Sequence, residues 1–162
     1  SEAMAQLAHN CPSGAITYER ADGGKGEVPP LVNIVRVREN GPLSINAPIF
    51  VDGVDQGLRA TLCRCGQSRK KPFCDSSHTA AGFVASGEPA KQESQTLELR
   101  NGPVNITPKP NGPLLISGNL EIVSGTGRTI NRVTKAVFCR CGNSANKPYC
   151  DGSHTRVGFK SE

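Results

Sequence analysis

Apolar and polar residues alternate in several short stretches of the chain, and each such stretch predicts a β-strand. The first stretch covers residues 31–37, a second covers 44–51, and a third covers 58–62. Asn40-Gly41-Pro42 and Asp52-Gly53 are turn sequences that separate them. The first half of the chain therefore predicts three short strands joined by tight turns.

The same order of elements returns in the second half. Val104-Asn105-Ile106 has the same three residues as positions 32–34, and Asn111-Gly112-Pro113-Leu114 has the same four residues as positions 40–43. Residues 115–123 and 133–138 predict two further strands, with a turn at residues 124–127. These upstream echoes are 72 and 71 positions apart, whereas the cysteine motifs described below are 76 apart. We therefore expect extra residues in the second hairpin, before its cysteines.

The first 30 residues have no counterpart in the second half. Residues 1–9 predict a short helix because they are rich in alanine, a turn follows at Cys11-Pro12-Ser13-Gly14, and residues 21–30 have the glycine and proline content of a linker. The chain is thus divided into residues 1–28, a first repeat over 29–88 and a second repeat over 89–162. Together these patterns predict a small, β-rich α+β protein.

Composition restricts the chemistry. The chain has seven cysteines, an odd number, and histidines recur with them, which favours metal ligation in a reducing compartment over a disulfide framework. The net charge of +5 is modest for a nucleic-acid-binding protein. The sequence contains no apolar run of about 18 residues, so we predict no membrane span. We also find no arrangement of nucleophile and base, and predict that the protein is not an enzyme.

Six cysteines and two histidines form two copies of one motif, at an offset of 76. The candidate metal ligands are Cys63, Cys65, Cys74 and His78 in the first copy and Cys139, Cys141, Cys150 and His154 in the second. Cysteines at i and i+2 of an extended segment point to one side. Gly66 and Pro72 turn the loop back towards them, and we expect Asp75 to cap a short helix that carries His78. Each half thus predicts one metal site with three thiolates and one imidazole.

At these motifs the sequence resembles the CDGSH iron–sulfur (NEET) family, whose pattern is Cys-x-Cys-x2-Ser/Thr-x3-Pro-x-Cys-Asp-Gly-x-His. The second copy fits this pattern throughout, and the first departs from it only at Ser76, where the family has glycine. The resemblance implies a 2Fe–2S cluster at each site, hence two clusters. Cys63 and Cys65, and Cys139 and Cys141, would bind the inner irons. Cys74 with His78, and Cys150 with His154, would bind the outer irons. A structural zinc module, which three cysteines and a histidine also suit, stays open as the alternative.

The resemblance also implies a fold and a role. We expect two repeats intertwined about a pseudo-two-fold axis, with a shared β-cap, in a monomer. The family transfers electrons or clusters, and its histidine ligand predicts redox-active clusters that are labile at acidic pH. Ten cations near the motifs predict either a solvated basic face or a surface that offsets an anionic cluster and docks an acidic redox or apo-iron–sulfur acceptor protein: Arg59, Arg64, Arg69, Lys70, Lys71, Arg128, Arg132, Lys135, Arg140 and Lys147. We expect a bacterial cytoplasmic protein, or a mitochondrial matrix protein if eukaryotic.

The segment before the repeats resembles the closing end of a divergent bacterial ferredoxin, through Asn10-Cys11-Pro12-Ser13-Gly14. No other cysteine lies near it to complete a cluster. We therefore interpret Cys11 and His9 as residues outside the metal sites.

Overall fold

The alternating stretches form the strands of one sheet. The computed structural model describes residues 2–162, and within them the sheet has eight strands. Seven follow the order β4-β3-β6-β7-β1-β2-β5, and β8 pairs with β7. The strands are β1 (Ile34–Val37), β2 (Leu43–Asn46), β3 (Ile49–Val51), β4 (Val54–Asp55), β5 (Arg59–Leu62), β6 (Val104–Pro108), β7 (Leu114–Val123) and β8 (Thr129–Phe138). The prediction of a small β-rich protein is confirmed.

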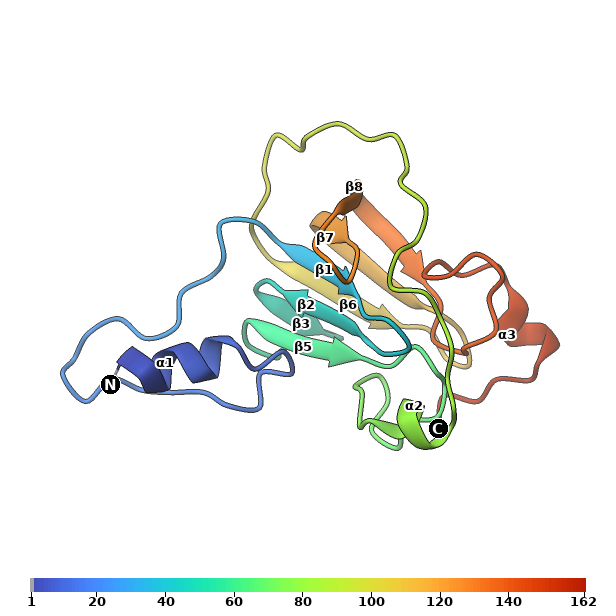
Figure 1. Ribbon diagram of the computed structural model, residues 1–162, viewed down its shortest axis with the longest axis horizontal. Coiled ribbons are helices and arrows are strands. Elements are labelled where there is room, and N and C mark those ends of the chain that lie inside the picture. Colours follow the sequence, from blue (N-terminus) through green and yellow to red (C-terminus); the bar gives the residue numbers. More distant parts are fainter. Residues whose placement is uncertain (1) are drawn as a thin grey trace.

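Among the described residues, three short helices accompany the sheet: α1 (Glu2–His9), α2 (Ser77–Ala80) and α3 (Ser153–Arg156). Figure 1 shows α1 and the linker on one side of the sheet, with α2 and α3 on the other. The predicted first helix is therefore present, although its first residue, Ser1, lies outside the described residues. No helix within residues 2–162 is long and apolar enough to cross a membrane.

Three predicted strand boundaries were wrong. The stretch 44–51 is two strands, because it is interrupted at Ala47-Pro48 and proline has no N–H to donate to a ladder. The Pro48 carbonyl instead accepts a hydrogen bond from the Val104 N–H at 2.8 Å. The first strand begins at Ile34 rather than Leu31, whose side chain is exposed. Strand β8 begins earlier than predicted, at Thr129.

The strand registers of the two halves correspond. Val35 pairs with Ile122 in the parallel β1–β7 ladder, and Ile106 pairs with Val51 in the parallel β3–β6 ladder. Val35 and Ile106 are 71 positions apart, as are Val51 and Ile122, so these residues are equivalent in the two halves. Each parallel ladder therefore pairs a strand of one half with a strand of the other, and the two ladders are equivalent. The antiparallel pairs β2–β5 and β7–β8 also correspond, Leu43 with Leu62 and Leu114 with Phe138. The extra residues of the second half lie in the β7–β8 hairpin, as predicted from the two offsets.

The hydrophobic core is formed by buried strand residues from both halves of the chain. Alternation in β1 buries Val35 and Val37 while Ile34 and Arg36 remain partly exposed. The largest fully buried side chains are aliphatic, apart from Arg64 and Phe138. The Phe138 ring stacks on Tyr149 with centroids 5.8 Å apart. Burial of these apolar side chains provides the driving force for the fold. It also fixes the ends of β5 and β8, from which the cysteine loops leave.

Candidate metal centres

The first two cysteines of each motif follow a strand directly. Cys63 comes after the last residue of β5 and Cys139 after the last residue of β8. The Sγ atoms of Cys63 and Cys65 are 3.7 Å apart, and those of Cys139 and Cys141 are also 3.7 Å apart. All four residues are buried. The i, i+2 spacing thus brings two thiols together on one side of each segment, as predicted.

The third cysteine and the histidine form a second pair in each motif. Cys74 Sγ lies 3.5 Å from His78 Nδ1, and Cys150 Sγ lies 3.5 Å from His154 Nδ1. These four residues are half-buried, so each motif has a buried pair and a more accessible pair. At the second site all four donors line one shallow surface hollow. Across residues 2–162, however, no three His, Cys, Asp or Glu side chains converge closely enough to hold one metal ion.

A serine folds each loop between the two pairs. Ser68 Oγ donates to the Phe73 carbonyl at 2.5 Å and accepts from the Lys70 N–H at 3.0 Å. Ser144 makes the equivalent bonds with the Tyr149 carbonyl, at 2.6 Å, and the Asn146 N–H, at 3.0 Å. A lysine of each loop, Lys71 or Lys147, donates its Nζ to the carbonyl of that serine at 2.7 Å. The two loops therefore have the same internal structure.

The prediction that the Asp75 side chain caps α2 is confirmed, although residue 76 and not Asp75 immediately precedes the helix. The Asp75 carboxylate accepts from the N–H of Ser77, the first residue of α2, at 3.0 Å, and from the Arg69 N–H at 2.9 Å. It thereby ties the loop to the start of the helix. These bonds hold the pKa of Asp75 well below its usual range. Asp151 has the same role, with Ser153 and Ala145.

Ser76 and Gly152 have the same backbone conformation. They occupy equivalent positions of the two motifs, where Gly152 matches the family pattern and Ser76 departs from it. Both are left-handed, with φ of 72° at Ser76 and 87° at Gly152. In this conformation the Ser76 N–H donates to Cys74 Sγ at 3.3 Å and the Gly152 N–H to Cys150 Sγ at 3.4 Å. A serine thus occupies a position whose geometry favours glycine, because a β-carbon is disfavoured there.

The arginine between the first two cysteines of each motif is buried. Arg64 donates to the carbonyls of Gly41 at 2.8 Å and Arg38 at 2.7 Å, and its guanidinium lies over the Phe83 ring at 5.4 Å. Arg140 makes the matching contacts with the Gly112 and Lys109 carbonyls and with the Phe159 ring. Burial lowers the pKa of Arg64 to about 10, and the nearby charge of Cys139 opposes this effect. Cys63 acts in the same way on Arg140, so each arginine is coupled electrostatically to the other motif.

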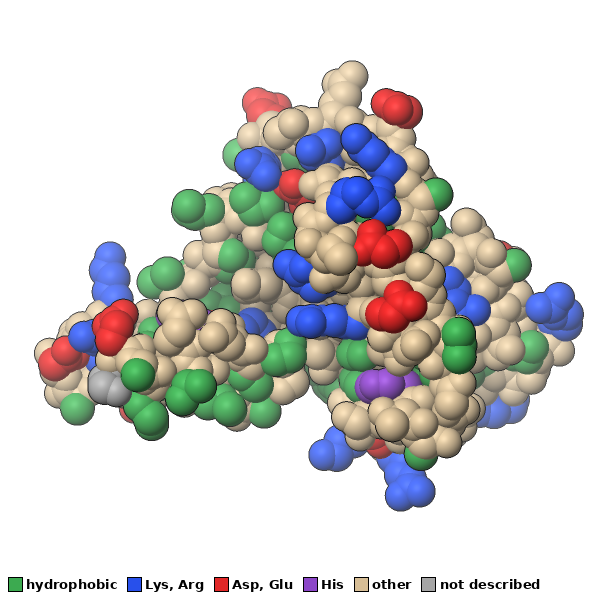
Figure 2. All heavy atoms as spheres, in the orientation of Figure 1, with side chains coloured by type: hydrophobic (Ala, Val, Ile, Leu, Met, Phe, Trp, Pro, Cys, Tyr) green, Lys and Arg blue, Asp and Glu red, His purple; other side chains and the backbone are tan. Residues whose placement is uncertain are grey.

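The ten cations near the motifs therefore do not form one surface. Arg59, Arg64 and Arg140 are buried, and Arg128 and Arg132 form ion pairs with Glu88 and Glu121. Arg69, Lys70 and Lys135 are exposed. Figure 2 shows Lys and Arg side chains dispersed over the visible face. Sequence spacing placed these cations near the motifs, but it could not separate structural arginines from exposed ones.

The two metal loops touch each other. A methyl group added at Gly66 would lie 2.8 Å from the Cys141 carbonyl oxygen, and one at Gly142 would lie 2.8 Å from the Cys65 carbonyl oxygen. This contact was not predicted, although Gly66 was recognised as a turn residue. A glycine at the same position of both motifs was its only signal in the sequence.

Cys11 and His9, which we predicted to lie outside the metal sites, have polar contacts within the N-terminal segment. Cys11 Sγ lies 3.4 Å from Ser13 Oγ, and His9 Nε2 lies 3.1 Å from the Tyr18 hydroxyl. Hydrogen bonding from Ser13, then from the Ile16 backbone, lowers the pKa of Cys11 to about 7. Among the motif thiols, by contrast, burial raises the pKa of Cys65, Cys74 and Cys141. Metal binding at the motifs therefore has to displace protons.

Comparison with known proteins agrees with this geometry. The profile of the family described as iron-binding zinc finger CDGSH type matches residues 40–79 and 111–155, just over half of the chain. The chain is also similar to CDGSH iron-sulfur domain-containing protein 1 of Rattus norvegicus and of Mus musculus, at 31% identity over 65 residues in each case. That stretch is 40% of this chain, and the chain spans 56% of the length of each relative. The chain belongs to the CDGSH iron–sulfur family and carries two of its motifs.

Proposed function

We propose that each motif holds one 2Fe–2S cluster and that the protein is a carrier of electrons or clusters rather than an enzyme. The observation that carries this proposal is the arrangement of each donor set as two pairs. In a 2Fe–2S centre each iron takes two protein donors. Cys63 with Cys65, and Cys74 with His78, are spaced as such pairs. The second motif repeats both spacings.

The buried arginines also fit an anionic group. A buried cation is costly unless a negative charge compensates it. Arg64 Nη1 is buried without a hydrogen-bond partner within the described part of the chain. Its guanidinium is influenced by Cys139, which belongs to the other motif. A cluster with three thiolate ligands would supply negative charge next to both arginines, whereas two empty sites would not.

The accessibility of the donors supports a transfer role. When bound, a 2Fe–2S cluster supplies a group that accepts and releases one electron at a time. The half-buried pair of each motif, Cys74 with His78 or Cys150 with His154, would hold the iron nearer to the surface. Arg69 and Lys70 are exposed on the first loop, which suits an acidic acceptor protein.

We further propose that the two repeats are related by a pseudo-two-fold axis within a monomer and share their strands. The exchange of halves in the β1–β7 and β3–β6 ladders supports this arrangement. In such a fold neither repeat completes its sheet alone. We propose the bacterial cytoplasm, or the mitochondrial matrix if the protein is eukaryotic, as its compartment.

The first test is metal content. The purified chain is expected to contain roughly four iron and four acid-labile sulfide, with visible absorption. Cys74→Ser and Cys150→Ser should each halve both contents, whereas Cys11→Ser should leave them unchanged. A colourless protein that contains zinc would overturn the proposal in favour of a structural zinc module, because zinc is d10.

A second test separates the two transfer roles. The oxidised, loaded protein is mixed with an apo-ferredoxin and, separately, with a reduced ferredoxin that already holds its cluster, because a histidine ligand raises the cluster potential above that of a ferredoxin with only cysteine ligands. Loss of iron and sulfide to the apo-protein indicates cluster donation, and reduction of the protein without metal loss indicates electron transfer. If neither partner changes the protein, the proposed transfer role is wrong, even if the metal content is as expected.

A further inference from the structure

The N-terminal segment is fastened to the sheet by one buried arginine. Arg59, on the edge strand β5, donates from Nε and Nη2 to the Glu27 carboxylate at 2.7 and 2.8 Å. It also donates to the carbonyls of Cys11 at 2.7 Å, of Ile16 at 3.0 Å, and of Ala8. Charge-assisted bonds of this kind are the stronger ones. These bonds hold residues 8–27 beside the sheet, and we call this segment the N-terminal wall.

A cavity of about 370 Å³ lies between this wall and the sheet. His9, Asn10 and Pro12 line it from the wall, and residues of β1, β2 and β5 line it from the sheet. Arg36 pairs with Ser44 across the β1–β2 ladder, and Asn46 pairs with Arg59 across the β2–β5 ladder. Neighbouring strands thus place these polar residues along one side of the cavity. None of the residues that line it is acidic.

Two of the three arginines in this cavity have no carboxylate partner. Arg59 is neutralised by Glu27. Arg36 donates Nη1 to the Gly125 carbonyl at 3.2 Å, and Arg38 donates Nε to Ser44 Oγ at 2.9 Å, but neither forms an ion pair within residues 2–162. Burial, and then the charge of Arg36, lowers the pKa of Arg38. The cavity is thus lined by two arginines that have no ion-pair partner among residues 2–162 and whose charges repel each other.

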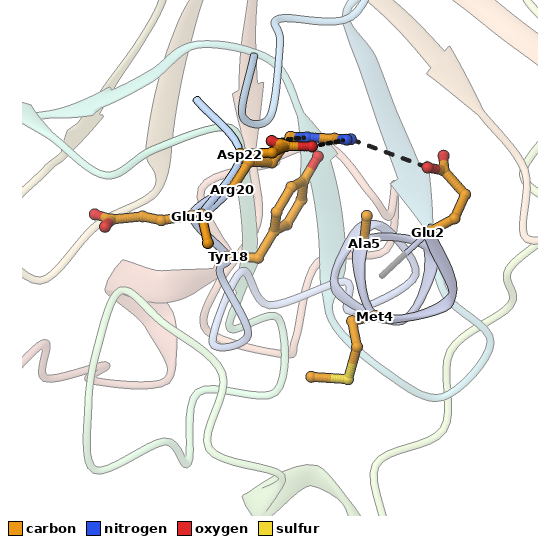
Figure 3. A pocket seen from close by; sticks show the side chains of 8 residues that line it. Glu2, Met4, Ala5, Tyr18, Glu19, Arg20 and Asp22 are labelled. Atoms are coloured by element: carbon orange, nitrogen blue, oxygen red, sulfur yellow. Dashed lines mark hydrogen bonds and ion pairs between the residues drawn. The ribbon is translucent and has the colours of Figure 1, made fainter. Parts of the chain in front are cut away.

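A second cavity on the same segment provides a contrast. It has about 380 Å³ and is lined by Glu2, Tyr18, Glu19, Arg20 and Asp22 among others. Figure 3 shows the Arg20 side chain directed towards Asp22 and Glu2, with which it forms ion pairs of 2.8 and 3.9 Å. That cavity already balances its cation with carboxylates. The cavity between wall and sheet does not.

We propose that the cavity formed by His9, Asn10, Arg36, Arg38, Ser44 and Asn46 binds a phosphoryl group, either as inorganic phosphate or on a small phosphomonoester. Two unpaired guanidinium groups match the charge of a phosphate dianion, and their planar N–H groups match its oxygens in pairs. Serine and asparagine side chains supply further hydrogen bonds. The volume lies in the range of small-molecule sites, which are about 300–1,000 Å³. The site gives the N-terminal segment a role that is independent of the metal centres.

The test is calorimetric titration of the full chain with inorganic phosphate, glycerol phosphate and acetate. We expect saturable binding of phosphate. Arg36→Gln and Arg38→Gln should each weaken it at least about tenfold, because each removes a charged hydrogen-bond donor. Arg69→Gln removes an exposed arginine outside the cavity and is the matched control. Tighter binding of glycerol phosphate identifies a phosphomonoester as the ligand, and equal binding identifies free phosphate.

The proposal is overturned if phosphate does not bind saturably, if acetate binds as tightly as phosphate, or if Arg69→Gln weakens phosphate binding as much as the cavity variants do. Unfolding temperatures of all variants without phosphate separate loss of the site from loss of the fold. Arg36→Lys and Arg38→Lys retain the charge but lose the planar donor pair. They should bind phosphate with intermediate affinity, and wild-type affinity in both would also overturn the proposal.

Discussion

Gly66 of the first metal loop packs against the backbone of Cys141 in the second. There is no room between them, because a β-carbon at Gly66 would lie 2.8 Å from the Cys141 carbonyl oxygen, and Gly142 meets Cys65 in the same way. The two motifs are separated by more than 70 residues in sequence, yet their ligand-bearing loops share one contact. A change in one loop is therefore transmitted to the other by packing.

Gly66→Ala is expected to weaken both metal sites. Gly66 has a φ of +79°, so alanine adds both a backbone cost of about 1 kcal/mol or more and the steric overlap with Cys141. Gly82→Ala is the matched control, because Gly82 has a φ of +65° but nothing within 4 Å of an added β-carbon. Decay of visible absorbance, resolved by site in the Cys74→Ser and Cys150→Ser backgrounds, measures the effect. Equal decay in Gly66→Ala and Gly82→Ala would disprove the coupling.

Ser76→Gly is expected to stabilise the first site. Ser76 has a left-handed backbone, and glycine removes its strain at the cost of a more flexible unfolded chain. The net gain should be about 0.5–1 kcal/mol in the free energy of unfolding, with slower loss of the first cluster. The reverse change, Gly152→Ser, should make the second site less stable. The idea that Ser76 weakens the first cluster fails if both clusters of the wild type decay at one rate that Ser76→Gly does not change.

Asp75→Asn is expected to reduce stability by the same amount at every pH above about 4. The hydrogen bonds to Ser77 and Arg69 lower the pKa of the folded carboxyl below its ordinary value of 3.8. The carboxylate therefore contributes stability that is fully present above the unfolded pKa and is lost only as pH falls through the lowered folded pKa. Urea midpoints of wild type and variant at pH 7 and pH 5 provide the measurement. Equal urea midpoints of wild type and variant at both pH values would show that the pKa is not lowered.

His154→Cys is expected to lower the reduction potential of the second cluster. A thiolate in place of a neutral imidazole adds one negative charge, so an added electron is less favourable. The hypothesis of acid lability adds that this variant should lose its second cluster more slowly at about pH 6, because free histidine titrates near pH 6.5. Voltammetry and absorbance decay measure the two effects, with His78→Cys as the matched variant of the first site. A double variant that bleaches as fast as wild type at this pH would exclude histidine as the acid switch.

The sequence by itself determined the local features of this protein. Two thiols at i and i+2 of an extended segment must point to one side, so the pairs Cys63–Cys65 and Cys139–Cys141 followed from spacing alone. The period-two alternation predicted most strands, and the difference between the offsets of 71 and 76 located the longer hairpin. All of these depend on residues close together in the chain.

Only the tertiary structure decided which residues meet across the chain. Arg59 looked like a cation of the first metal site, but it binds Glu27, which is 32 positions away, and fastens the N-terminal wall. Arg64 and Arg140 looked like surface charge, but they are buried under aromatic rings. The contact between Gly66 and Cys141 arises because the exchanged strands bring both loops together. Charge and spacing in a sequence do not specify burial or partner, since these depend on how distant strands pair around a common core.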